Sequence, residues 1–143
     1  MAKVTMKLPD DFLKDLSRLG DKFDSVAPKV LEAGGKVILS QMRTNLASVV
    51  GKDTKYESRS TGDLENSLGM TPALQDRNGE WNIRVGVGDD KDSKGVPNAL
   101  KAQLLEYGKS GQPAKPWMKP ARSKGRKKAI ASMKQVLEGE LLP

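Results

Sequence analysis

The sequence predicts a one-domain α+β protein, in which a long core helix packs on a small antiparallel β-sheet and is followed by an extended arm and a C-terminal helix. Three observations predict this class. Apolar residues recur at helical spacing over residues 25–50, an Asn-Gly pair separates two strand-like segments within residues 60–88, and a proline-rich stretch over residues 109–120 precedes a second apolar stripe. A chain of 143 residues suits one domain with a modest core, so we treat residues 1–143 as a single domain.

The N-terminal segment, residues 1–20, is expected to begin with an alternating apolar stretch and to continue as a short helix. Pro9 and the acidic residues Asp10 and Asp11 suit a helix start, and Gly20 suits its end. The apolar residues of the alternating stretch are Val4, Met6 and Leu8, and those of the helix are Phe12, Leu16 and Leu19. Their spacing within the helix predicts one apolar face.

The main core helix is predicted over residues 25–50. Ser25 is a candidate N-cap, and Pro28 falls in the first turn, where its missing N–H is harmless. Small or apolar residues repeat at helical spacing at Ala27, Val30 or Leu31, Gly34, Val37 or Ile38, Met42, Leu46 and Val49. Each of Gly34 and Gly35 costs the helix about 0.5–1 kcal/mol relative to alanine. The pair therefore predicts a tolerated weak point, a break in the helix, or a close approach of another backbone.

Residues 51–59 are polar and lack periodicity, which predicts a loop, and residues 60–88 then predict a short helix followed by a β-hairpin. Strand signals over residues 68–75 and 80–88 flank Asn78-Gly79, and an Asn-Gly pair is a strong hairpin signal. In the second strand, the alternating residues of the apolar face are Trp81, Ile83, Val85 and Val87. We expect these two strands to pair antiparallel.

The C-terminal third predicts a helix, an arm and a final helix. Residues 98–107 form a predicted helix that ends at Gly108, and its expected apolar face consists of Leu100, Leu104 and Tyr107. Residues 109–120 contain three prolines and a glycine, so they are expected to form an extended arm. Pro120 suits the first turn of a helix over residues 120–141. The apolar stripe of that helix is Ile130, Met133, Val136 or Leu137, and Leu141, whereas residues 122–128 are expected to be exposed.

The composition removes most enzyme mechanisms. The chain has no cysteine and no histidine, which excludes disulfides, thiolate nucleophiles, zinc sites built from those residues and triads that use imidazole. The remaining candidates are Asp63 with Glu65, Asp89 with Asp90, and Ser123 with Lys124. Nothing places any of these pairs in an apolar pocket that would separate their pKa values. We expect no catalytic site, no metal and no cofactor, and no apolar run predicts a membrane span or a signal peptide.

The net charge of +7 comes from one segment. Residues 109–134 contain nine of the 25 Lys and Arg residues and no Asp or Glu, so the rest of the chain is slightly acidic. Such a cluster attracts phosphates, with a salt-sensitive and largely sequence-independent affinity. Trp117 is the only aromatic residue within it, which is too few for a platform that stacks successive bases. The segment is therefore a solvated face, a surface that faces nucleic acid, or a docking surface for an acidic protein.

Three motifs in a fixed order resemble a known family. Residues 61–68 read Thr-Gly-x-Leu-x-x-Ser-Leu before the strand pair, residues 105–108 read Leu-Glu-Tyr-Gly, and residues 113–121 read Pro-Ala-Lys-Pro-Trp-Met-Lys-Pro-Ala. Together, over about residues 26–141, they resemble the head–tail joining or tail-completion family of long-tailed phages, the lambdoid "gene product ten" family. Trp117 stands where that family usually has Phe, and Lys119 where Arg is usual. The resemblance implies a small α+β subunit that assembles, typically as a ring, at the neck or upper end of the tail.

Three sets of residues are expected to carry this role. A subunit or partner interface is expected at Glu106, Tyr107, Gly108, Pro113, Pro116, Trp117, Met118 and Pro120. A surface that faces the DNA channel or an acidic partner is expected at Lys115, Lys119, Arg122, Lys124, Arg126, Lys127 and Lys128. The structural motif before the sheet consists of Thr61, Gly62, Leu64 and Ser67. Trp117, held between two prolines, is expected either to anchor in a neighbouring subunit or to complete the core of its own subunit.

The predicted function is that of a non-enzymatic virion protein, which completes the tail or joins it to the DNA-filled head. Its partners would be copies of itself in a ring, such as a hexamer, and the neighbouring neck and tail proteins. Contact with packaged DNA would be non-specific. The expected location is the virion neck, and the host cytoplasm during assembly. The alternative is a small basic protein that binds nucleic acid without sequence specificity, for which the basic segment is the only support.

Overall fold

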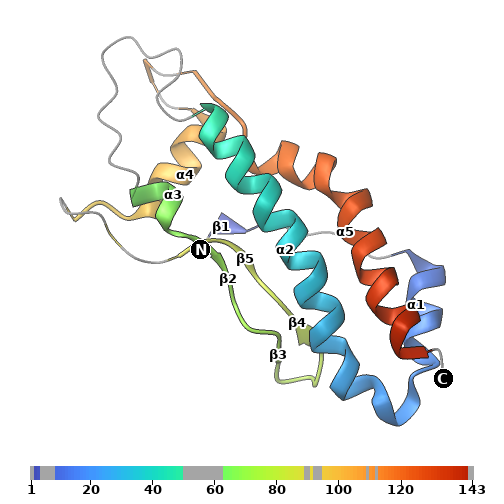
Figure 1. Ribbon diagram of the computed structural model, residues 1–143. Helices are drawn as coiled ribbons and strands as arrows, with labels where there is room; N and C mark the ends of the chain where they lie inside the picture. Colours follow the sequence, from blue (N-terminus) through green and yellow to red (C-terminus); the bar gives the residue numbers. More distant parts are fainter. Residues whose placement is uncertain are drawn as a thin grey trace.

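Two long helices that run in opposite directions form the centre of the fold, and the short strands and helices pack around them (Figure 1). The computed structural model describes residues 2–3, 9–49, 63–88, 91, 95–108, 110–111 and 113–141. The long helices are α2 (Phe23–Val49) and α5 (Met118–Leu141), which contact each other along most of their length. The α+β class is confirmed, because the sheet lies against α2 and the C-terminal helix lies beside it.

Helix α2 begins two residues earlier than expected. It continues directly from a short 3-10 turn, η1 (Gly20–Lys22), and Ser25 lies inside its first turn. Ser25 is therefore not an N-cap, since its Oγ donates a hydrogen bond to the carbonyl oxygen of Lys22 at 2.9 Å. The N-cap prediction is wrong because the preceding turn already points along the helix and leaves no place for a separate cap.

The Gly34-Gly35 pair does not break α2, and the groups that approach it closely are side chains rather than another backbone. A Cβ atom built on Gly34 would lie 2.6 Å from Sδ of Met133 on α5, and one on Gly35 would lie 3.0 Å from Sδ of Met70. The two glycines thus leave room on two different sides of α2, Gly34 toward α5 and Gly35 toward the sheet. The close-approach prediction is correct in kind and wrong about the partner.

Replacing Gly34 by alanine is expected to lower the free energy of unfolding by about 1 kcal/mol. The added methyl group forces the buried Met133 to repack, which costs about 1–3 kcal/mol and outweighs a gain in helix propensity of about 1 kcal/mol. Gly139→Ala is the matched control, because a Cβ there meets nothing within 4 Å and only the propensity gain remains. Urea denaturation of both variants measures the difference. Equal stabilisation of the two variants would contradict the steric role of Gly34.

The predicted hairpin forms, but it is divided into two short ladders. Strand β2 (Leu68–Met70) pairs antiparallel with β5 (Val85–Val87), which also pairs with β1 (Ala2–Lys3). Nearer the tip, β3 (Leu74–Gln75) pairs with β4 (Trp81–Asn82). The ladder is interrupted after Thr71, where Pro72 has no N–H to donate. The alternation predicted for the second strand does not extend to burial, because all three residues of β5 are buried.

The hairpin tip confirms the Asn-Gly signal. Gly79 has a φ of +79°, which favours glycine, and the N–H of Asp76 donates to the carbonyl oxygen of Glu80 at 2.9 Å. The Asp76 carboxylate accepts the N–H of Asn78 at 2.8 Å and that of Glu80 at 3.0 Å. The turn is therefore held by its own polar groups.

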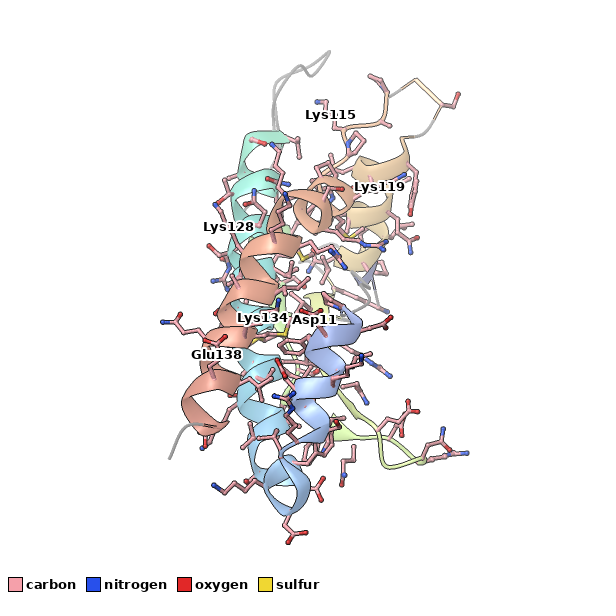
Figure 2. All side chains as sticks on the ribbon, turned by 90° about the vertical axis from the view of Figure 1, so that its right-hand side faces the viewer. Asp11, Lys115, Lys119, Lys128, Lys134 and Glu138 are labelled. Carbon is pink, nitrogen blue, oxygen red and sulfur yellow. The ribbon has the colours of Figure 1, made fainter. Side chains whose placement is uncertain are left out.

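Helix α1 (Asp10–Ser17) covers only the C-terminal half of α5 (Figures 1 and 2). These two helices and the start of α2 share a core cluster, which consists of Phe12, Leu19, Val26, Val30, Ile130, Met133 and Leu137. Lys134 Nζ lies 3.4 Å from Oδ2 of Asp11, and this ammonium holds the pKa of the Asp11 carboxyl below its ordinary value of 3.8. The helix predicted after Pro9 is confirmed, whereas Val4, Met6 and Leu8 lie outside the described residues.

The remaining helices are α3 (Asp63–Asn66) and α4 (Asn98–Tyr107), which contact each other at the end of the molecule where α5 begins. The second and larger core cluster lies there, between α2, the sheet, α4 and α5. Its buried members include Met42, Leu46, Val87, Ala102 and Trp117. Among the helices that the structure describes, none combines the length and the hydrophobicity that a membrane span requires.

Candidate functional site

Helix α4 has the predicted bounds, but the opposite face is buried. Leu100 is 46% exposed and Tyr107 is 78% exposed, while Leu104 is half-buried. The buried residues are Asn98, Ala102 and Glu106, which follow each other at intervals of four. The predicted face is wrong because two polar side chains and an alanine meet the neighbouring elements there. This arrangement leaves an apolar stripe of α4 at the surface.

Glu106 joins α4 to the first turn of α5. Its Oε2 accepts the backbone N–H of Trp117 at 2.6 Å and that of Met118 at 2.8 Å, and its Oε1 accepts the N–H of Lys119 at 3.0 Å. The glutamate is only 5% exposed. A carboxylate on one helix therefore caps the start of another, which is favoured by the positive end of the helix dipole.

With this cap, every N–H group in the first turn of α5 has a hydrogen-bond acceptor. A helix begins with N–H groups that have no partner inside the helix, and three of them donate to Glu106. The next residue, Pro120, has no N–H, and the N–H of Ala121 donates to the carbonyl oxygen of Trp117 at 3.2 Å to begin the regular ladder. The Leu-Glu-Tyr-Gly and Pro-Ala-Lys-Pro-Trp motifs are thus two halves of one structural device.

Trp117 is fully buried within its own chain. Its Nε1 donates to the carbonyl oxygen of Ala102 at 3.3 Å, and its own carbonyl oxygen accepts Nδ2 of Asn45 from α2 at 3.1 Å. The amide oxygen of Asn45 in turn accepts Nε2 of Gln41 at 2.8 Å. Of the two roles considered for Trp117, completion of its own core is the one that this geometry displays.

Sequence reasoning missed Asn45, Gln41 and Ala102. The available signal for Asn45 was a polar residue within an apolar stripe, one turn after Met42 and next to Leu46. Such a residue requires a buried partner. Nothing in the sequence named that partner as a carbonyl group 72 residues away.

The arm returns alongside α4 and presents the other expected interface residues. Gly108 ends α4 with a φ of +78°, as predicted, and its N–H donates to the carbonyl oxygen of Leu104 at 2.8 Å. The N–H of Lys115 donates to the carbonyl oxygen of Leu105 at 2.7 Å. Of the residues expected at the interface, Tyr107, Pro113 and Pro116 are exposed, and Gly108 and Pro120 are half-buried. The other three, Glu106, Trp117 and Met118, are buried. The buried three provide no surface for a partner in this conformation.

The N-terminal half of α5 carries the basic residues. Six of the expected cations are exposed there, namely Lys119, Arg122, Lys124, Arg126, Lys127 and Lys128, and Lys115 in the arm is half-buried. We call these six residues of α5 the basic surface. Residues 122–128 were expected to be exposed, but Gly125 is buried against α2. With Ala121 and Ala129 it forms a buried line on that side of α5.

The motif before the sheet is described only in part. Leu64 is buried in the larger core cluster, and the N–H of Ser67 donates to its carbonyl oxygen at 3.2 Å. The carbonyl oxygen of Ser67 accepts the N–H of Gly88, at the end of β5, at 3.1 Å. Thr61 and Gly62 lie outside the described residues. The described half of the motif therefore joins α3 to the sheet.

The catalytic alternatives gain no support from the geometry. Ser123 Oγ donates to the carbonyl oxygen of Lys119 on the exposed side of α5. Asp89 and Asp90 lie outside the described residues, as do the side chains of Asp63 and Glu65. Within the part of the chain that the structure describes, no group of three acidic side chains could hold a metal ion.

Comparison with known proteins assigns the chain to a family. Residues 10–108 match the model of the HK97-gp10-like family, described as a tail component of bacteriophage HK97. The match extends from the start of α1 to the glycine that ends α4, and the arm and α5 follow it. No curated protein and no solved structure matches the chain. Because the matched residues make up more than half of the sequence, the chain belongs to the HK97-gp10-like family of bacteriophage tail components.

Proposed function

We propose that this protein is a structural subunit of the virion neck, which completes the tail or joins it to the DNA-filled head and assembles there as a ring around the DNA channel. The observation that carries this proposal is membership in a family of tail components. Its partners would be further copies of itself and the adjoining neck and tail proteins. It would act in the virion and be assembled in the host cytoplasm.

The exposed stripe of α4 and the arm supply a contact surface for such partners. Leu100 and Tyr107 lie on one side of α4, seven residues apart, and Pro113 and Pro116 are exposed on the arm. Aromatic residues are enriched in protein interfaces, and a proline-rich segment loses little conformational entropy when it docks. The cap at Glu106 holds this surface in place, because it fixes the arm at the point where α5 begins.

Deletion of the gene tests the function. Filled heads and separate tails should accumulate in the infected cell and should join again when the wild-type protein is supplied, which electron microscopy of lysates would show. Tyr107→Ser should fail to restore joining, while Leu74→Ser, which removes an exposed apolar side chain from β3, should restore it. Normal joining without the gene would reject the proposed function. Restoration by Tyr107→Ser would reject only the assigned contact surface.

A further inference from the structure

We propose that the basic surface of α5 binds the phosphate backbone of double-stranded DNA without reading its bases. This inference rests on the proposed function, because a subunit placed around the DNA channel would have the packaged genome as its largest anionic neighbour. The surface comprises six exposed cations within ten residues of helix, and residues 109–134 contain no acidic residue. At 1.5 Å per residue, these cations extend over about 14 Å of the helix axis.

The packing of α5 explains why its charge lies in one half of the helix. Ile130, Met133 and Leu137 are buried under α1 and the start of α2. One and two turns before Ile130, the same side of α5 carries Arg126 and Arg122. Figure 2 shows α1 beside Lys134 and the later turns of α5, while Lys128 lies beyond the end of α1. An apolar side is thus replaced by a cationic side at the point where its cover ends.

Close contact with α2 directs the cations outward. A Cβ atom on Gly125 would lie 3.0 Å from Cδ1 of Ile38, so the two helices approach closely on that side. Successive residues of a helix are turned by about 100°, so Arg126, Lys127 and Lys128 point in three different directions. Lys119 and Lys128 lie on opposite sides of this half of α5 (Figure 2). Positive charge therefore surrounds the helix everywhere except toward α2.

The available groups fit a duplex backbone better than other nucleic-acid features. Trp117 is fully buried, so the surface offers no aromatic ring on which an unpaired base could stack. The N–H groups at the start of α5 donate to Glu106, so this helix terminus is not free to bind an anion. Binding must come from the long Lys and Arg side chains. Such contacts are salt-dependent and independent of sequence.

Binding of the purified full-length protein to two unrelated duplexes, over a range of salt concentrations, tests the proposal. Both duplexes should bind equally, with an affinity that falls as salt rises. The triple variant Arg126→Gln, Lys127→Gln, Lys128→Gln should bind about tenfold more weakly at low salt, and the slope of log affinity against log salt should become shallower by up to about 2.7, or 0.9 for each lost phosphate contact.

The matched control is Lys14→Gln, Arg18→Gln, Lys22→Gln. It also removes one Arg and two Lys from exposed positions, but from α1, η1 and the residues between them, among five carboxylates of residues 10–24. It should bind DNA as the wild type does. Equal loss in both variants, or wild-type binding by the first, would overturn the proposal. Displacement of DNA by polyglutamate at equal charge concentration would also overturn it and would assign the surface to an acidic protein.

The outcome is independent of the test of function. DNA binding is measured with purified protein and requires no virion, whereas joining of heads and tails is scored after deletion of the gene. If the deletion prevents joining and the basic variant still binds DNA as the wild type does, the proposed function stands and this inference fails. If joining is normal and the basic variant loses DNA binding, the opposite holds.

Discussion

Glu106→Ala is expected to lower the free energy of unfolding by about 3–5 kcal/mol. The substitution leaves three backbone N–H groups at the start of α5 without their acceptor, and each buried donor that loses its partner costs about 1–3 kcal/mol. Water admitted to the vacated space would recover part of this cost. For a domain of this size, the loss corresponds to a fall in melting temperature of about 10 °C or more.

Glu106→Gln separates the acceptor role from the volume of the side chain. The amide oxygen still accepts hydrogen bonds, but its NH2 group faces N–H donors, so we expect a smaller loss of about 1–2 kcal/mol. Glu138→Gln on the exposed side of α5 is the control, and it should change stability by less than about 0.5 kcal/mol. Thermal denaturation followed by circular dichroism provides the comparison. A wild-type melting temperature for Glu106→Ala would mean that the cap contributes nothing.

The parts of the fold that could be predicted from the sequence are those that interactions between neighbouring residues decide. Local signals were sufficient where local physics decides the structure: the helical spacing in α2, the turn at Asn78-Gly79, and the glycine that ends α4. Each of these depends on residues close together in the chain. The bounds of α4 were predicted correctly for the same reason.

The buried face of α4 could not be predicted, because groups distant in sequence decide it. An apolar stripe normally faces the core, and here the side with Glu106 does so because the N–H groups of α5 require an acceptor. Glu106 and Met118 are 12 residues apart, across a proline-rich arm. Their spacing in the sequence carries no sign of a hydrogen bond.

In the candidate site too, some features could be predicted from the sequence and others could not. The exposure of the basic surface followed from charge alone, since six cations in ten residues are costly to bury. The motif residues were singled out by resemblance, and the match over residues 10–108 confirms the family. Glu106 and Trp117 were expected at a subunit or partner interface, and the structure buries both within their own chain. The ring, its subunit number and its location in the neck stay predictions.

Trp117→Ala is expected to destabilise the protein by about 3–5 kcal/mol, the range typical of removing a large aromatic side chain from a core. Trp117 is fully buried among residues of α2, α4 and the sheet. These residues pack against one another and cannot move far enough to fill the space that the substitution leaves. Trp117→Phe should cost about 1–2 kcal/mol, because a ring remains and the hydrogen bond to Ala102 is lost. Trp81→Phe is the control, since Trp81 is half-buried and its Nε1 bonds to Asp24 at the surface. Its cost should stay below about 1 kcal/mol.

Fluorescence distinguishes a tryptophan that belongs to its own core from one that docks in a neighbour. The chain has two tryptophans, so Trp81→Phe leaves Trp117 as the single emitter. A residue enclosed by its own subunit should emit at short wavelength and be shielded from a soluble quencher at every protein concentration. Docking in a neighbour would instead make the emission shift to longer wavelength as dilution separates the subunits. A concentration-dependent shift would therefore overturn the assignment of Trp117 to its own core, and it would require the arm to release its hydrogen bonds to Glu106 first.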